Sequence, residues 1–200
     1  MSADSILTWS AAAWWGIAGA AALFYLDTPF RTFGQTFLVR RGRERLVMLS
    51  FELDLIALWA VATFFLHWRW PLAPPAAAVP LAIAGLGLTL AGAVLAVWSK
   101  LSLGRWFSAT FGVKEGHELR TAGPYAFTRH PIYTGLLAML IGGALVQNRA
   151  VTLLLAILMA APLFFHTVYE ESLFEQHFGP AYFEYQRRVP RLLPWPRPNR

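Results

Sequence analysis

The stretch Gly123–Gly135, GPYAFTRHPIYTG, places an arginine, a histidine and a tyrosine at the start of a long apolar segment. Proline suits the first turn of a helix, because its fixed φ is helical and its missing N–H is not needed there. Pro131 is therefore predicted to begin a helix, with His130 before it in the extended conformation that a following proline favours. The free N–H groups of residues 132–134, beside Arg129, would favour a carboxylate or a phosphate.

Two interpretations of this helix start stay open. Arg129, His130 and Tyr133 either bind a ligand or serve as interfacial anchors, which are common at the ends of membrane spans. Gly135, one turn further on, would let a ligand or a neighbouring helix approach the backbone closely.

The rest of the chain has a composition suited to lipid rather than water. Its 200 residues are 56% hydrophobic and 14% charged, whereas soluble domains carry about 25% charged residues. The absence of cysteine excludes disulfides and thiolate catalysis. A membrane-spanning helix needs about 20 apolar residues. Five segments meet that need and are predicted spans: 9–26, 46–66, 79–98, 131–147 and 150–169.

The basic residues predict how these spans are oriented. Most of the 17 Lys and Arg residues fall in the first loop, the third loop and the tail. The positive-inside rule then places the N-terminus outside and the C-terminus in the cytoplasm. We therefore expect an all-α integral membrane protein with about five transmembrane helices. Because the charge is explained by topology, no nucleic-acid partner is expected.

The chain is expected to form a single membrane domain over residues 1–200. Three spans would occupy residues 1–98, followed by a cytoplasmic connector at 99–130. A helical hairpin would follow at 131–169, and cytoplasmic helices at 170–200 would complete the chain.

The hairpin brings a second polar cluster towards the first. A helix rises ~1.5 Å per residue, so Glu170 and Glu171 return to nearly the depth of Arg129 and His130. Carboxylates at a membrane boundary are costly unless they are paired or hydrated. The resulting pocket would suit a ligand with an anionic end, hydroxyls and a positive centre. The alternative is a set of structural ion pairs, such as Arg129 with Glu171.

The last helix of the hairpin is predicted to continue to Phe178, where Gly179-Pro180 breaks it. A second short helix would follow and carry two tyrosines and two arginines, namely Tyr182, Tyr185, Arg187 and Arg188.

The stretches TAGPYAFTRHPIYTG and EESLFEQHFGPAYFEYQRRVPRLLP resemble the isoprenylcysteine carboxyl methyltransferase family, over roughly residues 100–195. That family is part of a wider group of integral-membrane methyltransferases that includes phospholipid N-methyltransferases. The resemblance implies S-adenosylmethionine as methyl donor, bound by the C-terminal helices at the cytoplasmic face. It also implies a lipophilic or amphiphilic acceptor, such as a prenylcysteine-type carboxylate, and membrane lipids as further partners.

The resemblance also implies roles for individual residues. Its cofactor-binding set is His117, Arg129, His130, Pro131, Tyr133, Gly135, Glu170, Glu171, Tyr182 and Tyr185. Arg129 would address the methionyl carboxylate, and Glu170 or Glu171 would hold the ribose hydroxyls or the ammonium. The catalytic set is Glu170, Glu171, Arg187 and Arg188. In it the carboxylates are candidate proton acceptors, and an arginine orients an acidic substrate.

Several alternatives remain open at this point. A membrane reductase of the sterol or steroid type, which would use NADPH, shares the H-P-x-Y region, and a non-enzymatic membrane protein is also conceivable. Gly85-x-Gly87 either packs helices, the favoured interpretation, or resembles a glycine pair of the phospholipid enzymes. Glu52 and Asp54 either line a substrate tunnel or pair with a loop arginine. The sequence shows no metal-ligand spacing.

Overall fold

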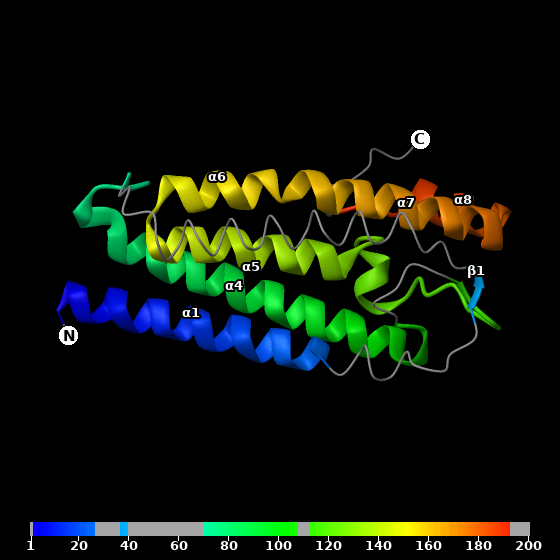
Figure 1. Ribbon diagram of the computed structural model, residues 1–200, viewed down its shortest axis with the longest axis horizontal. Helices are drawn as coiled ribbons and strands as arrows, with labels where there is room; N and C mark the ends of the chain where they lie inside the picture. Colours follow the sequence, from blue (N-terminus) through cyan, green and yellow to red (C-terminus); the bar gives the residue numbers. More distant parts are fainter. Residues whose placement is uncertain (1, 27–36, 40–69, 108–112, 193–200) are drawn as a thin grey trace.

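The computed structural model describes residues 2–26, 37–39, 70–107 and 113–192. Its helices lie side by side along one axis, with α4 between α1 and α5, and the short helix α8 lies at one end (Figure 1). The helices are α1 (Ala3–Leu26), α4 (Pro75–Leu103), α5 (Pro131–Gln147), α6 (Ala150–Leu158), α7 (Ala160–Phe178) and α8 (Pro180–Arg188). The predicted helical architecture is confirmed in this form.

Four of the five predicted spans fall within these helices, and the segment 46–66, with Glu52 and Asp54, lies outside the described residues. By length and composition, two described helical segments suffice to cross a membrane: Pro75–Trp106 and Ala150–Phe178. Pro131–Gln147 is a shorter apolar helix. The count of five spans and their orientation therefore stay predictions.

A tight turn joins α5 to α6, as expected. Asn148 ends α5 in the left-handed conformation, with φ 50°, which asparagine tolerates better than most residues. Its side chain also exchanges two hydrogen bonds with the backbone of Ala73, at 2.9 and 3.1 Å. The turn is thus fixed to the segment that precedes α4.

The predicted span at 150–169 is interrupted at Met159, where α6 ends and α7 begins. Pro162 explains the interruption, because a proline inside a helix lacks the N–H that would bond the carbonyl four residues earlier, here that of Leu158.

Pairs of glycines bring α4 and α5 into close contact. A Cβ placed on Gly92 would lie 2.5 Å from the carbonyl oxygen of Gly135, and one on Gly85 would lie 2.6 Å from that of Gly142. Small residues let membrane helices approach in this way. Gly87 has nothing within 4 Å of its Cβ position. The packing interpretation is therefore confirmed for Gly85, and Gly135 faces a helix.

A two-stranded antiparallel sheet also forms, which the all-α prediction missed. It pairs β1 (Phe37–Val39) with β2 (Val113–Lys114). Two and three residues are too few to show the alternation by which strands are recognised. The ammonium of Lys114 donates to the carbonyls of Arg105 and Phe107, at 2.6 and 2.7 Å, and so holds the connector after α4.

The close contact between α4 and α5 predicts that alanine substitutions at two glycines will have opposite effects on stability. Gly142→Ala would force a methyl group against the backbone of α4, so we expect it to lower the free energy of unfolding by about 1–3 kcal/mol. Gly87→Ala is the matched control and should be neutral or stabilising by up to about 1 kcal/mol, because alanine favours helix. Thermal unfolding of both variants in detergent measures the difference. Equal stability of the two variants would contradict the proposed contact.

Candidate functional site

The two polar clusters meet at the carboxylate of Glu171, which is only 1% exposed. Its Oε1 lies 2.9 Å from Nε of Arg129 and 3.0 Å from Nε2 of His130. Its Oε2 lies 3.2 Å from Nη2 of Arg129 and 2.7 Å from Nη2 of Arg191. The side-chain amide of Gln186 donates to the same oxygen at 3.1 Å. The hairpin therefore returns Glu171 to Arg129 and His130, as the helix lengths predicted.

The start of α5 differs from expectation in two respects. His130 has φ −127° and ψ 61°, so it is not in the fully extended conformation. Its carbonyl accepts the N–H of Thr134 at 3.0 Å, so this N–H is not free to bind an anion. The anion beside Arg129 is the protein's own Glu171. Pro131 begins the helix as predicted and is buried.

His130 lies between two carboxylates. Its Nε2 faces Glu171, and its Nδ1 lies 3.4 Å from Oε2 of Glu170. Burial alone would lower the pKa of His130, but the hydrogen bonds with Glu170 and Glu171 outweigh it and raise the pKa above its usual value. The protonated ring, with a donor on both nitrogens, is thereby favoured.

Glu170 and Glu171 differ in their access to a ligand. Glu171 has five close contacts with protein donors, and a carboxylate has only about four lone-pair sites. The side chain of Glu170 is 29% exposed. Two guanidinium nitrogens of Arg129 donate hydrogen bonds, one to Glu171 and one to the backbone carbonyl of Gln186 at 3.0 Å, and its Nε contacts Glu171 as an ion pair without a hydrogen bond. The geometry therefore supports the ion-pair interpretation for Arg129 and Glu171, and their roles towards a ligand stay predictions.

The two predicted tyrosines of α8 are buried in one apolar cluster with Val189. The hydroxyl of Tyr185 donates to the carbonyl of Tyr125 at 2.7 Å, which ties α8 to the short 3₁₀ turn Gly123–Ala126 before α5. Burial raises the pKa of both Tyr182 and Tyr185. Both hydroxyls therefore stay protonated at neutral pH, and the role of the two tyrosines towards a cofactor stays a prediction.

His117 belongs to an aromatic cluster on the connector. Its ring stacks on Trp106 with centroids 5.1 Å apart and planes inclined by 10°, and it meets the edges of Phe174 and Phe178, each at 5.8 Å. Burial, with a smaller contribution from the nearby His177, lowers the pKa of His117 to about 4. The ring is therefore neutral at pH 7, and Trp106 is a neighbour that the sequence did not suggest.

Two further predicted cofactor residues lie on α5. The ring of Tyr133 is 5.9 Å from that of His130 and 6.2 Å from that of His166. Gly135, in contrast, packs on Gly92 and Ala96 of α4. The geometry gives Gly135 a packing role, and its role towards a cofactor stays a prediction.

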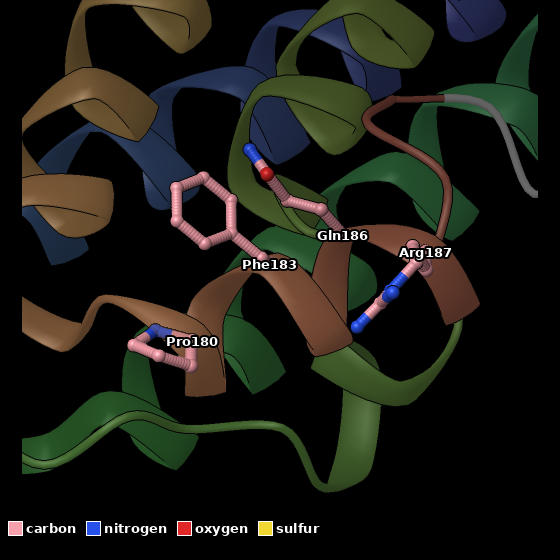
Figure 2. Close-up of a pocket in the computed structure, with 4 residues that line it drawn as sticks. All are labelled: Pro180, Phe183, Gln186 and Arg187. Atoms are coloured by element: carbon pink, nitrogen blue, oxygen red, sulfur yellow. The ribbon is translucent and has the colours of Figure 1, made fainter.

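A pocket of about 550 Å³ opens on α8, lined by Pro180, Phe183, Gln186 and Arg187 (Figure 2). Of the two predicted arginines, only Arg187 lines it. Arg188 is on the surface, where it pairs with Glu184 at 3.2 Å. The mixture of apolar, amide and cationic groups suits an amphiphilic ligand with a negative charge.

Gln186 and Arg191 are the contacts of Glu171 that sequence reasoning missed. Gln186 also donates to Glu175 at 2.7 Å. Since Gln186 lines the pocket, it connects the pocket to Glu171 and Glu175, which lie on one face of α7. Neither residue shows a spacing relative to Glu171 that would reveal the contact, because each depends on the chain turning back after α7 or α8. Among the described residues, no group of three potential ligands is placed to hold a metal ion.

Most of the known proteins that the chain resembles are named as methyltransferases. The chain matches the family model "Phospholipid methyltransferase" over residues 81–181. It is 30% identical over 114 residues to protein-S-isoprenylcysteine O-methyltransferase B of Arabidopsis thaliana, covering 56% of this chain and 58% of that protein. It is also 33% identical over 110 residues to the cobalt-zinc-cadmium resistance protein CzcN of Cupriavidus metallidurans, covering 54% and 49%. The chain thus spans about half the length of the curated relatives it matches.

A solved structure supports the fold. The chain is similar to the eukaryotic intramembrane Ras methyltransferase ICMT, with a TM-score of 0.57 and 22% identity. The match covers 92% of this chain and 68% of that one. The helical arrangement of Figure 1 therefore resembles the fold of that methyltransferase.

The burial of Glu171 predicts that its loss costs stability. Glu171→Gln would leave the guanidinium of Arg129 buried without its counter-ion, and breaking a buried pair in this way costs about 3–5 kcal/mol. Glu184→Gln, which removes an exposed carboxylate from the pair with Arg188, should cost about 1 kcal/mol or less. Denaturant unfolding in detergent compares them. A Glu171→Gln variant as stable as Glu184→Gln would refute the structural role.

Proposed function

The chain belongs to the phospholipid methyltransferase family, and from that membership we propose that it transfers a methyl group from S-adenosylmethionine to a lipophilic or amphiphilic acceptor. The match over residues 81–181 confirms the resemblance that the motifs predicted. The observation that carries the proposal is the meeting of both motif stretches at Glu171. No observation favours the reductase or the non-enzymatic alternative.

The residues present fit S-adenosylmethionine in their chemistry. The partly exposed carboxylate of Glu170 would hold the ammonium or the ribose hydroxyls. When bound, the cofactor supplies a methyl group activated on a sulfonium, and the protein's contribution is position and electrostatics.

The chain's own residues then have distinct tasks. Glu171, held by Arg129 and Arg191, fixes the start of α5 against α7. His130 orients Glu170 from the other side. A carboxylate acceptor needs no general base, since it is already the nucleophile. An amine acceptor would have to give up a proton, and Glu170 is the carboxylate placed to take it.

The acceptor is proposed to enter with its apolar part in the lipid. Arg187 would bind an anionic group such as a prenylcysteine-type carboxylate, and Phe183 would contact the adjoining apolar part. Exposed aromatic side chains on α7, Phe164 at 45% and Phe165 at 63%, face outward from the bundle and suit a lipid environment.

The site is proposed to face the cytoplasm. The connector and α8, which carry most of the described basic residues, lie at one end of the bundle, and the α5–α6 turn, with Arg149, lies at the other (Figure 1). By the positive-inside rule, the end with α8 is cytoplasmic.

Cofactor binding tests the proposal most directly. We expect the purified protein in detergent to bind S-adenosylhomocysteine and not reduced nicotinamide nucleotide, measured by calorimetry. Glu170→Gln should weaken that binding about tenfold, equivalent to about 1.4 kcal/mol. Glu184→Gln is the control for loss of a carboxylate on an exposed surface and should bind normally. Binding of the nicotinamide nucleotide instead would refute the proposal.

The two arginines of α8 provide a matched test of the acceptor site. Arg187→Gln should raise KM for an anionic prenylcysteine-type acceptor about tenfold, because one charge-assisted contact contributes about 1.5–3 kcal/mol. Arg188→Gln removes the same charge from the surface and should leave KM unchanged. Initial rates with detergent-solubilised acceptor measure both. Equal KM values for the two variants would remove Arg187 from the acceptor site.

A further inference from the structure

We infer that Arg191 is a positioning residue of the proposed site, which holds Glu171 from the C-terminal segment and thereby sets how firmly His130 and Glu170 are paired. The inference rests on the proposed function for its relevance to catalysis. The contacts from which it is drawn do not depend on that function.

Arg191 contacts both sides of the site. Its guanidinium makes the shortest contact of Glu171, at 2.7 Å, and lies 5.0 Å from the ring centroid of Phe164 on α7. Its backbone carbonyl accepts the N–H of His130 at 3.1 Å and the hydroxyl of Thr128 at 2.8 Å. One residue therefore fixes the backbone at the start of α5 and the carboxylate of α7.

The residues on either side of Arg191 also hydrogen-bond to the segment at the start of α5. The carbonyl of Pro190 accepts the N–H of Arg129 at 2.9 Å, and that of Leu192 accepts the hydroxyl of Thr134 at 2.6 Å. The segment Pro190–Leu192 thus lies along residues 128–134 through consecutive carbonyls. This pairing limits where the guanidinium of Arg191 can go.

The charges explain why the guanidinium matters to His130. The groups facing His130 are Glu170 and Glu171 from α7, and Arg129 and Tyr133 from its own segment. Arg191 shares Glu171 with it. The guanidinium contacts Oε2 and the imidazolium Oε1, so the two cations share the negative charge of one carboxylate. Without it, Glu171 would bind the protonated ring more strongly and draw it away from Glu170.

Titration of His130 in the ligand-free protein tests this inference. The imidazole of His130 is followed by NMR in detergent, and its signal is assigned by its loss in His130→Gln. In Arg191→Gln we expect the pKa of His130 to rise by about one unit, because a cation sharing its carboxylate is removed. Arg188→Gln removes an equal charge from the surface and should leave the titration unchanged. Identical titrations in these two variants would overturn the inference.

If Arg191→Gln does not fold, two conservative lysine variants provide the test. Arg191→Lys keeps the charge, but it loses the planar donor group that fits a carboxylate. It should shift the pKa of His130 by less than Arg191→Gln and weaken S-adenosylhomocysteine binding severalfold. Arg188→Lys should change neither, and equal behaviour of the two lysine variants would overturn the inference.

The two readouts separate this inference from the proposed function. The titration contains no cofactor, so a shift in Arg191→Gln supports the positioning role even if the wild-type protein binds no S-adenosylhomocysteine. Absence of that binding would refute only the proposed function.

Discussion

The buried carboxylate of Glu171 needs cationic or hydrogen-bond-donating partners to offset the cost of its burial. The contacts with those partners hold together the segments at the end of the molecule that carries the site. Glu171 sits at the boundary of an apolar helix, where an unpaired charge costs several kcal/mol. Its compensation comes from two arginines, a histidine and an amide on three other segments. Because the compensation is shared, α5, α7, α8 and the C-terminal segment are fixed relative to one another. The exposed neighbour, Glu170, then has a defined position on that assembly.

The contact of Glu171 with Arg129 and His130 depends on the position of α5 along the axis of the bundle. The close contacts between glycines of α5 and α4 determine that position. Gly135 and Gly142 allow the backbones to approach at two points one heptad apart. Trp14 of α1 lies against Gly143 on another side of α5, and its indole N–H donates to the carbonyl of Met139 at 3.2 Å. Close packing of small residues therefore sets the position of α5 in the bundle, and Glu171 and the segment Pro190–Leu192 hold its start.

The sequence predicted which residues meet at the site better than it predicted their partners and roles. Helix lengths and the Pro131 start were sufficient to bring Glu171 to Arg129 and His130, since both follow from the rise of a helix. The partners Gln186 and Arg191 were not predictable, because they depend on two changes of chain direction that no local pattern encodes. Gly135 was assigned to a cofactor by resemblance, whereas its facing partner, Gly92, lies 43 residues earlier on another helix. The break at Met159 follows from Pro162, but an apolar run alone gives no sign of it.

The order in which the partners of Glu171 occur along the chain has a consequence for biosynthesis. Arg129 and His130 precede it, whereas Arg191 follows it by 20 residues. At about 5–20 residues per second, the carboxylate is synthesised roughly one to four seconds before its last counter-ion. During that interval Arg129 and His130 are available to Glu171, and water must supply the contacts that Arg191 makes later. The final packing of α7 against α5 is therefore expected only after Arg191 has been synthesised.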